Sequence, residues 1–278
     1  MTSWRIRARD PTSPRTGHQR SGMSSVTDTD AIYTLFTDLP RQGPGSDAAT
    51  LDVIRRLPPL PDSPTVLDIG CGSGKQTLVL ARTLKVRIEA IDVHQPFLDQ
   101  LQSAAIKEGL APYIRTRQLS MEALDYAPES IDLIWSEGAV YIMGVSTALR
   151  SWLPLLRPGG FFVFSEATWL TENPPPRAAA FFQKCYPQME TVSGNLRRAK
   201  AEQYEVLETY TLPAQTWWDG FYKPLQERIE FLRPQAAAWP ELAGVITETE
   251  EEISVFSQHS ESYGYVFYIL RRPAGSPR

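Results

Sequence analysis

Cysteine and histidine are scarce in this sequence. Only two cysteines, Cys71 and Cys185, and three histidines occur in 278 residues. Two thiols make neither a disulfide framework nor a metal cluster, and no histidine has a second ligand at metal-binding spacing. We therefore expect reduced thiols, a cytoplasmic location and no bound metal.

Long hydrophobic runs are also lacking. Apolar runs such as residues 161–164 and 266–270 have about the length of a strand, whereas a membrane-spanning helix needs about 20 consecutive apolar residues. No membrane partner is expected. Hydrophobic residues make up 42% of the chain and charged residues 22%, a balance that excludes a wholly disordered or fibrous protein.

Positive charge is sparse beyond the first residues. The formal net charge is −4, but residues 1–22 hold five arginines against Asp10 alone, which leaves the rest of the chain at −8. Nucleic-acid binding relies on clustered Lys and Arg, so nucleic acid is disfavoured as a partner. Residues 1–22 show no apolar period and are predicted to be a disordered tail, or an over-extended start before Met23. Residues 23–278 are expected to form a single domain.

From about Asp30 onward, short apolar strands alternate with helices. Ser46 is placed to cap a helix that ends at a group of prolines beginning with Pro58. Further helices are expected at residues 76–84 and 148–156, and between them one that carries apolar residues from Phe97 to Ala105 and stops at Gly109. Strands are expected at residues 65–69, 86–91, 131–135, 160–164, 205–212 and 263–270. This alternation predicts βαβ units on a parallel sheet covered on both faces. After Glu166 this alternation of strands and helices ends. Helical insertions are expected at about 171–203 and 212–262, and the second is expected to form a lid over the site.

The most informative stretch is the glycine turn after the first of these strands, which runs Asp68-Ile69-Gly70-Cys71-Gly72-Ser73-Gly74. Glycines here let the backbone turn tightly and approach a ligand without interference from a Cβ. Asp92 follows 22 residues after Gly70, at the end of the next strand, where a carboxylate can accept hydrogen bonds from both hydroxyls of a ribose. The combination predicts an adenosine-type cofactor.

Three better-known motifs are incomplete or misplaced in this sequence. A dinucleotide fingerprint needs a third glycine where Lys75 stands, and a phosphate-binding P-loop needs glycine at Ile69 and Ser or Thr at Gln76. An NAD-dependent oxidoreductase therefore remains only a weaker alternative. Residues 173–175, Asn-Pro-Pro, lie after the wrong strand for the motif of methyltransferases that act on the amino groups of bases.

The chain resembles the class I S-adenosylmethionine-dependent methyltransferases. The resemblance rests on the E/D-x-G-x-G-x-G signature at residues 68–74, the ribose acid Asp92, and residues 120–122 and 132–139. Residues 135–144 and 263–269 are similar to a subgroup of bacterial methyltransferases presumed to act on small molecules. The resemblance implies a Rossmann-like, doubly wound α/β sheet of strand order 3-2-1-4-5-7-6, mostly parallel with a terminal antiparallel strand. It implies methyl transfer (EC 2.1.1) from S-adenosylmethionine to a small-molecule acceptor, and it is compatible with a homodimer.

The resemblance also implies the roles of individual residues. Cofactor contacts are expected from Gln42, Asp68, Gly70, Gly72, Asp92, Val93, Met121, Glu122 and Glu137. Within this set Asp68 receives the methionine ammonium or orders the loop, Met121 packs on the adenine, and Glu137 lines the sulfonium. Tyr141 and Glu166 are expected to orient or deprotonate the nucleophile. The residues themselves leave plainer interpretations open, namely a simple turn, a core methionine and surface carboxylates, and a non-catalytic cofactor-binding module of the same fold stays an alternative.

Overall fold

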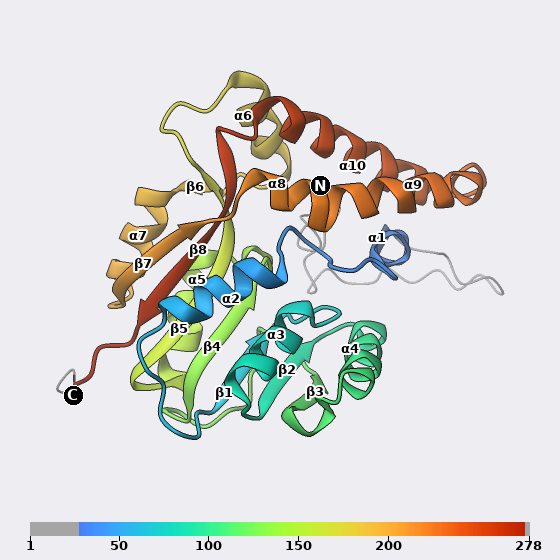
Figure 1. Cartoon of the computed structure of the whole chain (residues 1–278). Coiled ribbons are helices and arrows are strands. Elements are labelled where there is room, and N and C mark those ends of the chain that lie inside the picture. The colour runs from blue at the N-terminus through green and yellow to red at the C-terminus, as the bar shows by residue number, and fades with distance from the viewer. Residues whose placement is uncertain (1–27, 276–278) are drawn as a thin grey trace, which may run out of the picture.

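The computed structural model describes residues 28–275, which form one sheet with helices on both of its faces (Figure 1). The strand order is β3-β2-β1-β4-β5-β8-β7, and the short β6 pairs with β5. The strands are β1 Val66–Ile69, β2 Ile88–Asp92, β3 Ile114–Gln118, β4 Ile131–Glu137, β5 Leu156–Trp169, β6 Glu190–Thr191, β7 Glu205–Thr211 and β8 Tyr263–Arg271. Residues 1–22, for which a tail or an over-extended start was predicted, lie outside the described part of the chain.

The predicted strand order is confirmed. The numbers of its last two strands shift by one because β6, a two-residue strand, precedes them, and the sequence analysis did not anticipate it. The pairs from β3 through β5 are parallel, whereas β8 runs antiparallel to both β5 and β7. β1 and β4 are almost wholly buried, as expected for strands covered on both faces.

The helices are α1 Asp28–Phe36, α2 Asp47–Arg56, α3 Lys75–Leu84, α4 Gln95–Lys107, α5 Val145–Trp152, α6 Pro176–Cys185, α7 Val192–Ala201, α8 Ala214–Trp217, α9 Lys223–Ala236 and α10 Pro240–His259, with single turns η2 Ala111–Tyr113, η3 Val140–Ile142, η4 Leu153–Leu155 and η5 Trp218–Tyr222. The Ser46 cap is confirmed, since its Oγ accepts from the Ala49 amide at 3.1 Å. The helix predicted at 148–156 was misplaced. It begins at Val145 and ends at Trp152, because β5 starts at Leu156 and is longer than predicted.

Alternate residues of the strands build the core on both faces of the sheet. Val66 and Leu133 face an apolar cluster that includes Leu80 of α3, whereas Leu67 and Ile134 face a second cluster with α5. This alternation follows from the two-residue period of a strand. The sheet is thereby fixed between two layers, and the loops that follow β1, β2 and β4 are held at one edge.

The segment between β7 and β8 forms α8, η5, α9 and α10, which we call the lid helices. Figure 1 shows α9 and α10 extending from the sheet with α1 beneath them. Arg228 of α9 donates a hydrogen bond to the Thr34 carbonyl at 3.0 Å, and Phe36 stacks on Phe221 at a centroid distance of 6.2 Å. Segments from both ends of the described chain therefore form one packed layer. Within residues 28–275, no helix combines the length and the apolar character that crossing a membrane requires.

Candidate cofactor site

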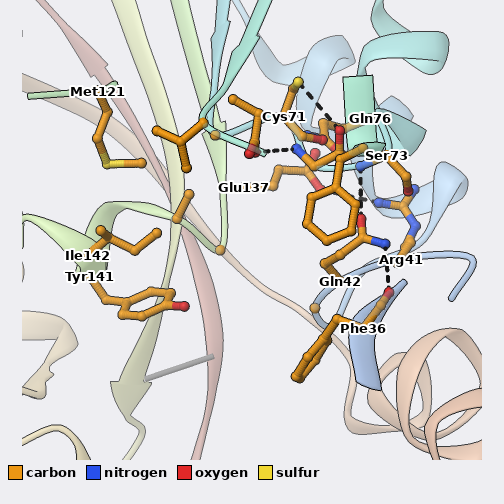
Figure 2. Close-up of a pocket in the computed structure, with 18 of the residues that line it drawn as sticks. Phe36, Arg41, Gln42, Cys71, Ser73, Gln76, Met121, Glu137, Tyr141 and Ile142 are labelled. Carbon is orange, nitrogen blue, oxygen red and sulfur yellow. Dashed lines mark hydrogen bonds and ion pairs between the residues drawn. The ribbon is translucent and has the colours of Figure 1, made fainter. Parts of the chain in front are cut away.

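A cavity of about 400 Å³ lies at the edge of the sheet where β1, β2 and β4 end (Figure 2). Its volume is within the range of small-molecule sites. Of the residues expected at the site, it is lined by Gln42, Gly70, Gly72, Asp92, Val93, Met121, Glu122, Glu137 and Tyr141. Asp68 and Glu166 are not among the described residues that line it. The structure thus brings nine of the eleven predicted site residues to one cavity.

The glycine turn requires glycine for both conformation and space. Gly70 and Gly72 have φ angles of +68° and +54°, which side-chain-bearing residues rarely adopt. A Cβ on Gly70 would lie 2.6 Å from the Ala139 Cβ, and one on Gly72 would lie 2.7 Å from Gln42 Oε1. The turn therefore presents bare backbone to the cavity, as expected of a loop that a ligand approaches closely.

Asp92 connects the end of β2 to this turn. Its Oδ2 accepts from the Gly72 amide and its Oδ1 from the His94 amide, both at 2.9 Å. Burial raises the pKa of Asp92, while the same backbone amides act in the opposite direction. Each carboxylate oxygen has a further lone pair, so Asp92 can hold the turn and still accept hydrogen bonds from a ribose.

Asp68 lies beneath the turn and is fully buried. Its Oδ2 accepts from the Thr77 hydroxyl at 2.6 Å, whereas its Oδ1 has no hydrogen-bond partner within residues 28–275. Burial raises the pKa of Asp68 to about 7. The bond to Thr77 of α3 favours the predicted role in ordering the loop. Oδ1 is a buried acceptor beneath the turn, and its contact with a methionine ammonium stays a prediction.

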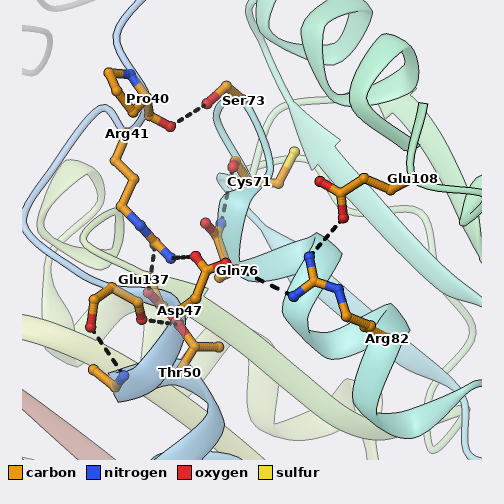
Figure 3. Close-up of polar contacts among 12 residues, drawn as sticks. Pro40, Arg41, Asp47, Thr50, Cys71, Ser73, Gln76, Arg82, Glu108 and Glu137 are labelled. Carbon is orange, nitrogen blue, oxygen red and sulfur yellow. Dashed lines mark hydrogen bonds and ion pairs between the residues drawn. The ribbon is translucent and has the colours of Figure 1, made fainter. Parts of the chain in front are cut away.

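Glu137 borders the cavity, but both of its oxygens have protein partners. Oε1 accepts from the Thr50 hydroxyl at 2.8 Å and from the Trp135 indole at 2.9 Å, and Oε2 lies 3.6 Å from Arg41 Nη1. Arg41 also pairs with Asp47 at 2.8 Å (Figure 3). Burial raises the pKa of Glu137, and the Arg41 guanidinium counteracts this. No pattern in the sequence predicted this ion-pair network.

The segment 37–46 between α1 and α2, which we call the strap, lies across the glycine turn. Gln42 Oε1 accepts from the Ser73 amide at 2.8 Å, and the Ser73 hydroxyl donates to the Pro40 carbonyl at 3.4 Å (Figure 2, Figure 3). The Gln42 amide nitrogen also donates to the Leu39 carbonyl at 3.3 Å. Gln42 therefore attaches the strap to the turn, and its contact with a methionine carboxylate or a substrate stays a prediction.

One wall of the cavity comes from α1, which the sequence analysis did not assign. Tyr33 stacks on His94 with a centroid distance of 3.7 Å and an interplanar angle of 2°, and Phe36 also lines the cavity. The aromatic residues at 33 and 36 have the spacing of one helical face, a signal that could have revealed this wall. Opposite it, Met121 reaches the turn, since its Cε would lie 3.3 Å from a Cβ on Gly70.

The two residues expected to act on the nucleophile lie in different places. Tyr141 of η3 is 4% exposed, lines the cavity and packs edge-on against Tyr186 at 6.1 Å. Glu166 lies on β5, is 1% exposed, and accepts from the Ala167 amide at 3.0 Å. Only Tyr141 is placed to meet a ligand in this cavity.

Comparisons with known proteins agree with this geometry. A family model described as a methyltransferase domain matches residues 66–160. A dimethylglycine N-methyltransferase of Parasynechococcus marenigrum is 31% identical over 44% of each chain. An uncharacterized methyltransferase of Bacillus subtilis, YodH, is 29% identical over 48% of this chain and 55% of that protein. The chain thus matches about half the length of these relatives. A 27-O-demethylrifamycin SV methyltransferase of Amycolatopsis mediterranei is 25% identical over 80% of this chain and 82% of that protein's length.

Solved structures share the fold. A methyltransferase from Thiobacillus denitrificans in complex with S-adenosylhomocysteine has a TM-score of 0.74 at 19% identity, covering 86% of this chain and 96% of that one. One from Geobacter sulfurreducens has a TM-score of 0.73 at 20% identity, covering 89% and 98%. The chain thus has the fold of the S-adenosylmethionine-dependent methyltransferases among these structures, and its residues 66–160 match a methyltransferase domain.

Proposed function

We propose that the protein transfers the methyl group of S-adenosylmethionine to a small-molecule acceptor by in-line displacement. One observation carries this proposal: a single cavity joins the glycine turn and Asp92 to Tyr141 and Gly138. Residues suited to hold a cofactor therefore share one cavity with a residue suited to orient an acceptor.

The adenosine end of the site is formed by residues after β2 and β3. Asp92 accepts hydrogen bonds from the ribose hydroxyls, with Val93 beside it. Met121 packs against the adenine, and Glu122 borders the adenine amino group. The backbone of Gly70 and Gly72 supports the amino-acid part, while Asp68 below it keeps the turn in place through Thr77.

The protein's contribution to the reaction is mainly alignment and exclusion of water. When bound, S-adenosylmethionine supplies an activated methyl group on sulfur and a good leaving thioether. Holding the acceptor in line with that group can then provide most of the acceleration. The strap and α1 cover the cavity, and Tyr141 contacts the acceptor from η3. No strongly basic residue is required under these conditions.

The printed names of relatives support a small acceptor. Besides dimethylglycine and a demethylated rifamycin, they include trans-aconitate, in an Azoarcus methyltransferase that is 31% identical over 40% of this chain and 42% of its own. The negative charge of the chain beyond residue 22 argues against a nucleic acid. We place the acceptor among small metabolites.

One observation favours a second candidate, a cofactor-binding protein of this fold without methyl transfer. The structure named the [4+2]-cyclase SpnF has a TM-score of 0.69 at 20% identity, covering 88% of this chain and 94% of that one. This fold therefore does not by itself specify methyl transfer.

A two-stage experiment separates the candidates. Calorimetry first measures binding of S-adenosylmethionine and S-adenosylhomocysteine. A screen with tritiated-methyl cofactor over small acids, amines, phenols and thiols then looks for a labelled product, which is identified by mass. Binding with a labelled product supports methyl transfer, and binding with no product over the panel supports the second candidate. No binding would contradict both.

A further inference from the structure

The wall that α1 adds to the cavity is apolar and aromatic. Ile32, Tyr33 and Phe36 of this helix line the cavity, and Ile32 and Phe36 are 3% and 5% exposed. Residues three and four positions apart share one face of a helix, so these side chains form a continuous surface. Phe221 of η5 supports this surface from behind, since its ring stacks on Phe36 at a centroid distance of 6.2 Å. The lid helices therefore hold the α1 wall in place.

A second wall comes from η3. Tyr141 and Ile142 line the cavity, and Tyr141 packs edge-on against Tyr186 at a centroid distance of 6.1 Å. In Figure 2 the side chains of Phe36, Tyr141 and Ile142 all lie away from Cys71 of the glycine turn. These residues of α1 and η3 therefore line a part of the cavity distinct from the glycine turn, which we call the α1–η3 end.

Charge is distributed unevenly over the cavity. Among the cavity residues within 28–275, those of α1 and η3 carry no charge. The charged ones come from the strap, the start of α3 and the segments that follow β2, β3 and β4, and they are Arg41, Lys75, Asp92, Glu122 and Glu137. A carboxylate at the α1–η3 end would lose its hydration without gaining a cationic partner, which costs free energy. An apolar group at the same place gains free energy on leaving water.

We infer that the α1–η3 end binds the body of the acceptor, meaning the part other than the methylated group, and that this body is an uncharged aromatic ring system. A ring is favoured because Phe36 and Tyr141 can pack against it, and aromatic pairs gain more than burial alone provides. Phe36 and Ile142 are then specificity-determining residues. The inference rests on the proposed methyl-transfer function and narrows its acceptor from small metabolites to aromatic ones such as phenols.

Two probes with the same ring system test the inference: 2-naphthol and 2-naphthoate. Each is titrated by calorimetry into protein saturated with S-adenosylhomocysteine, so that the cofactor part of the cavity is already filled. We expect 2-naphthol to bind. We expect 2-naphthoate to bind at least about tenfold more weakly, because its carboxylate meets no cation at the α1–η3 end.

Two variants locate the binding of 2-naphthol. Phe36→Leu keeps an apolar side chain but removes the ring, and it should lower the affinity at least about threefold through the lost aromatic contact. Ile142→Ala shortens a half-buried side chain of the other wall and should also lower the affinity at least about threefold, since each buried methylene contributes to binding. Because Ile142 is only half-buried, this variant keeps the test valid if Phe36→Leu does not fold.

Phe231→Leu is the matched control for Phe36→Leu. Phe231 of α9 is 73% exposed and is not among the described residues that line the cavity, so its replacement should leave the affinity for 2-naphthol unchanged. Phe36→Leu and Ile142→Ala should both keep the wild-type affinity for S-adenosylhomocysteine. An equal loss for S-adenosylhomocysteine and 2-naphthol would assign these side chains to the cofactor and overturn the inference.

Three further results would overturn it. They are no binding of 2-naphthol to the protein saturated with S-adenosylhomocysteine, equal affinity for 2-naphthol and 2-naphthoate, and unchanged affinity for 2-naphthol in the folded variants at positions 36 and 142. In each case the binding of S-adenosylhomocysteine leaves the proposed function standing. Failure of the wild type to bind S-adenosylhomocysteine would instead contradict the proposed function.

Discussion

Gly220 of η5 lies directly against Gly45 of the strap, so close that a Cβ at position 220 would overlap the Gly45 carbonyl oxygen. This contact joins the lid helices to the segment that covers the glycine turn. The strap is also attached to the turn through Gln42 and Ser73. The packing of the lid helices and the position of the strap over the glycine turn are therefore physically linked.

Gly220→Ala should weaken both stability and cofactor binding. The added methyl group must displace the strap or η5, and overpacking of this kind costs about 1–3 kcal/mol. Gly244→Ala in α10 is the matched control, because a Cβ there meets nothing within 4 Å and alanine is favoured over glycine in a helix by up to about 1 kcal/mol. Denaturant unfolding and calorimetry with S-adenosylhomocysteine measure the two effects. Equal stability and affinity in the two variants would refute the link.

Asp92→Ala should lower the affinity for S-adenosylmethionine at least about tenfold, because hydrogen bonds to a charged group contribute about 1.5–3 kcal/mol. Part of the loss of affinity will come from a less ordered glycine turn, because Asp92 also accepts a hydrogen bond from the Gly72 amide. Asp125→Ala, which removes an exposed carboxylate paired with Arg117, serves as the control and should bind normally. Calorimetry that shows unchanged affinity in Asp92→Ala would contradict the ribose assignment.

The raised pKa of Asp68 predicts a pH-dependent stability of the cofactor-free protein. Its pKa is about 7 in the folded state and about 3.9 when unfolded, so the folded state binds the proton more tightly. The contribution of Asp68 to stability is then full below about pH 4 and is lost as the pH rises through about 7. Asp68→Asn removes this dependence. The difference in unfolding free energy between wild type and Asp68→Asn should therefore fall over that window, and parallel curves in urea unfolding would argue against it.

Arg41→Ala should be strongly destabilising. Arg41 is 8% exposed and faces Glu137, whose side chain is 6% exposed, and removing one member of a buried ion pair costs about 3–5 kcal/mol. It should also raise the pKa of Glu137 further, since the guanidinium lowers it. The double variant Arg41→Ala/Glu137→Gln should recover part of the loss in a double-mutant cycle. Strict additivity of the two single changes would show that the pair is not coupled.

The strands, the glycine turn and Asp92 could be predicted from the sequence because their signals are local, whereas the order of the strands in the sheet was implied by the family resemblance. A strand repeats every two residues, and a turn with positive φ angles selects glycine within a few positions. The placement of Glu137 at the end of β4 followed in the same way. Its partners did not, because Thr50 is 87 residues away along the chain and no short pattern connects them.

By itself, then, the sequence determined the class of fold and the edge of the sheet that carries the cofactor-site residues. The period of a strand and the positive φ angles of glycine both depend on residues that are close together along the chain. Only the tertiary structure decided that Arg41 and Gln42 hold the strap, that Tyr33 stacks on His94, and that the ring of Tyr265 lies against Gly138. These contacts join residues brought together by the packing of α1, the lid helices and β8. Such packing depends on the shape of the whole core, so no short repeating sequence pattern predicts it.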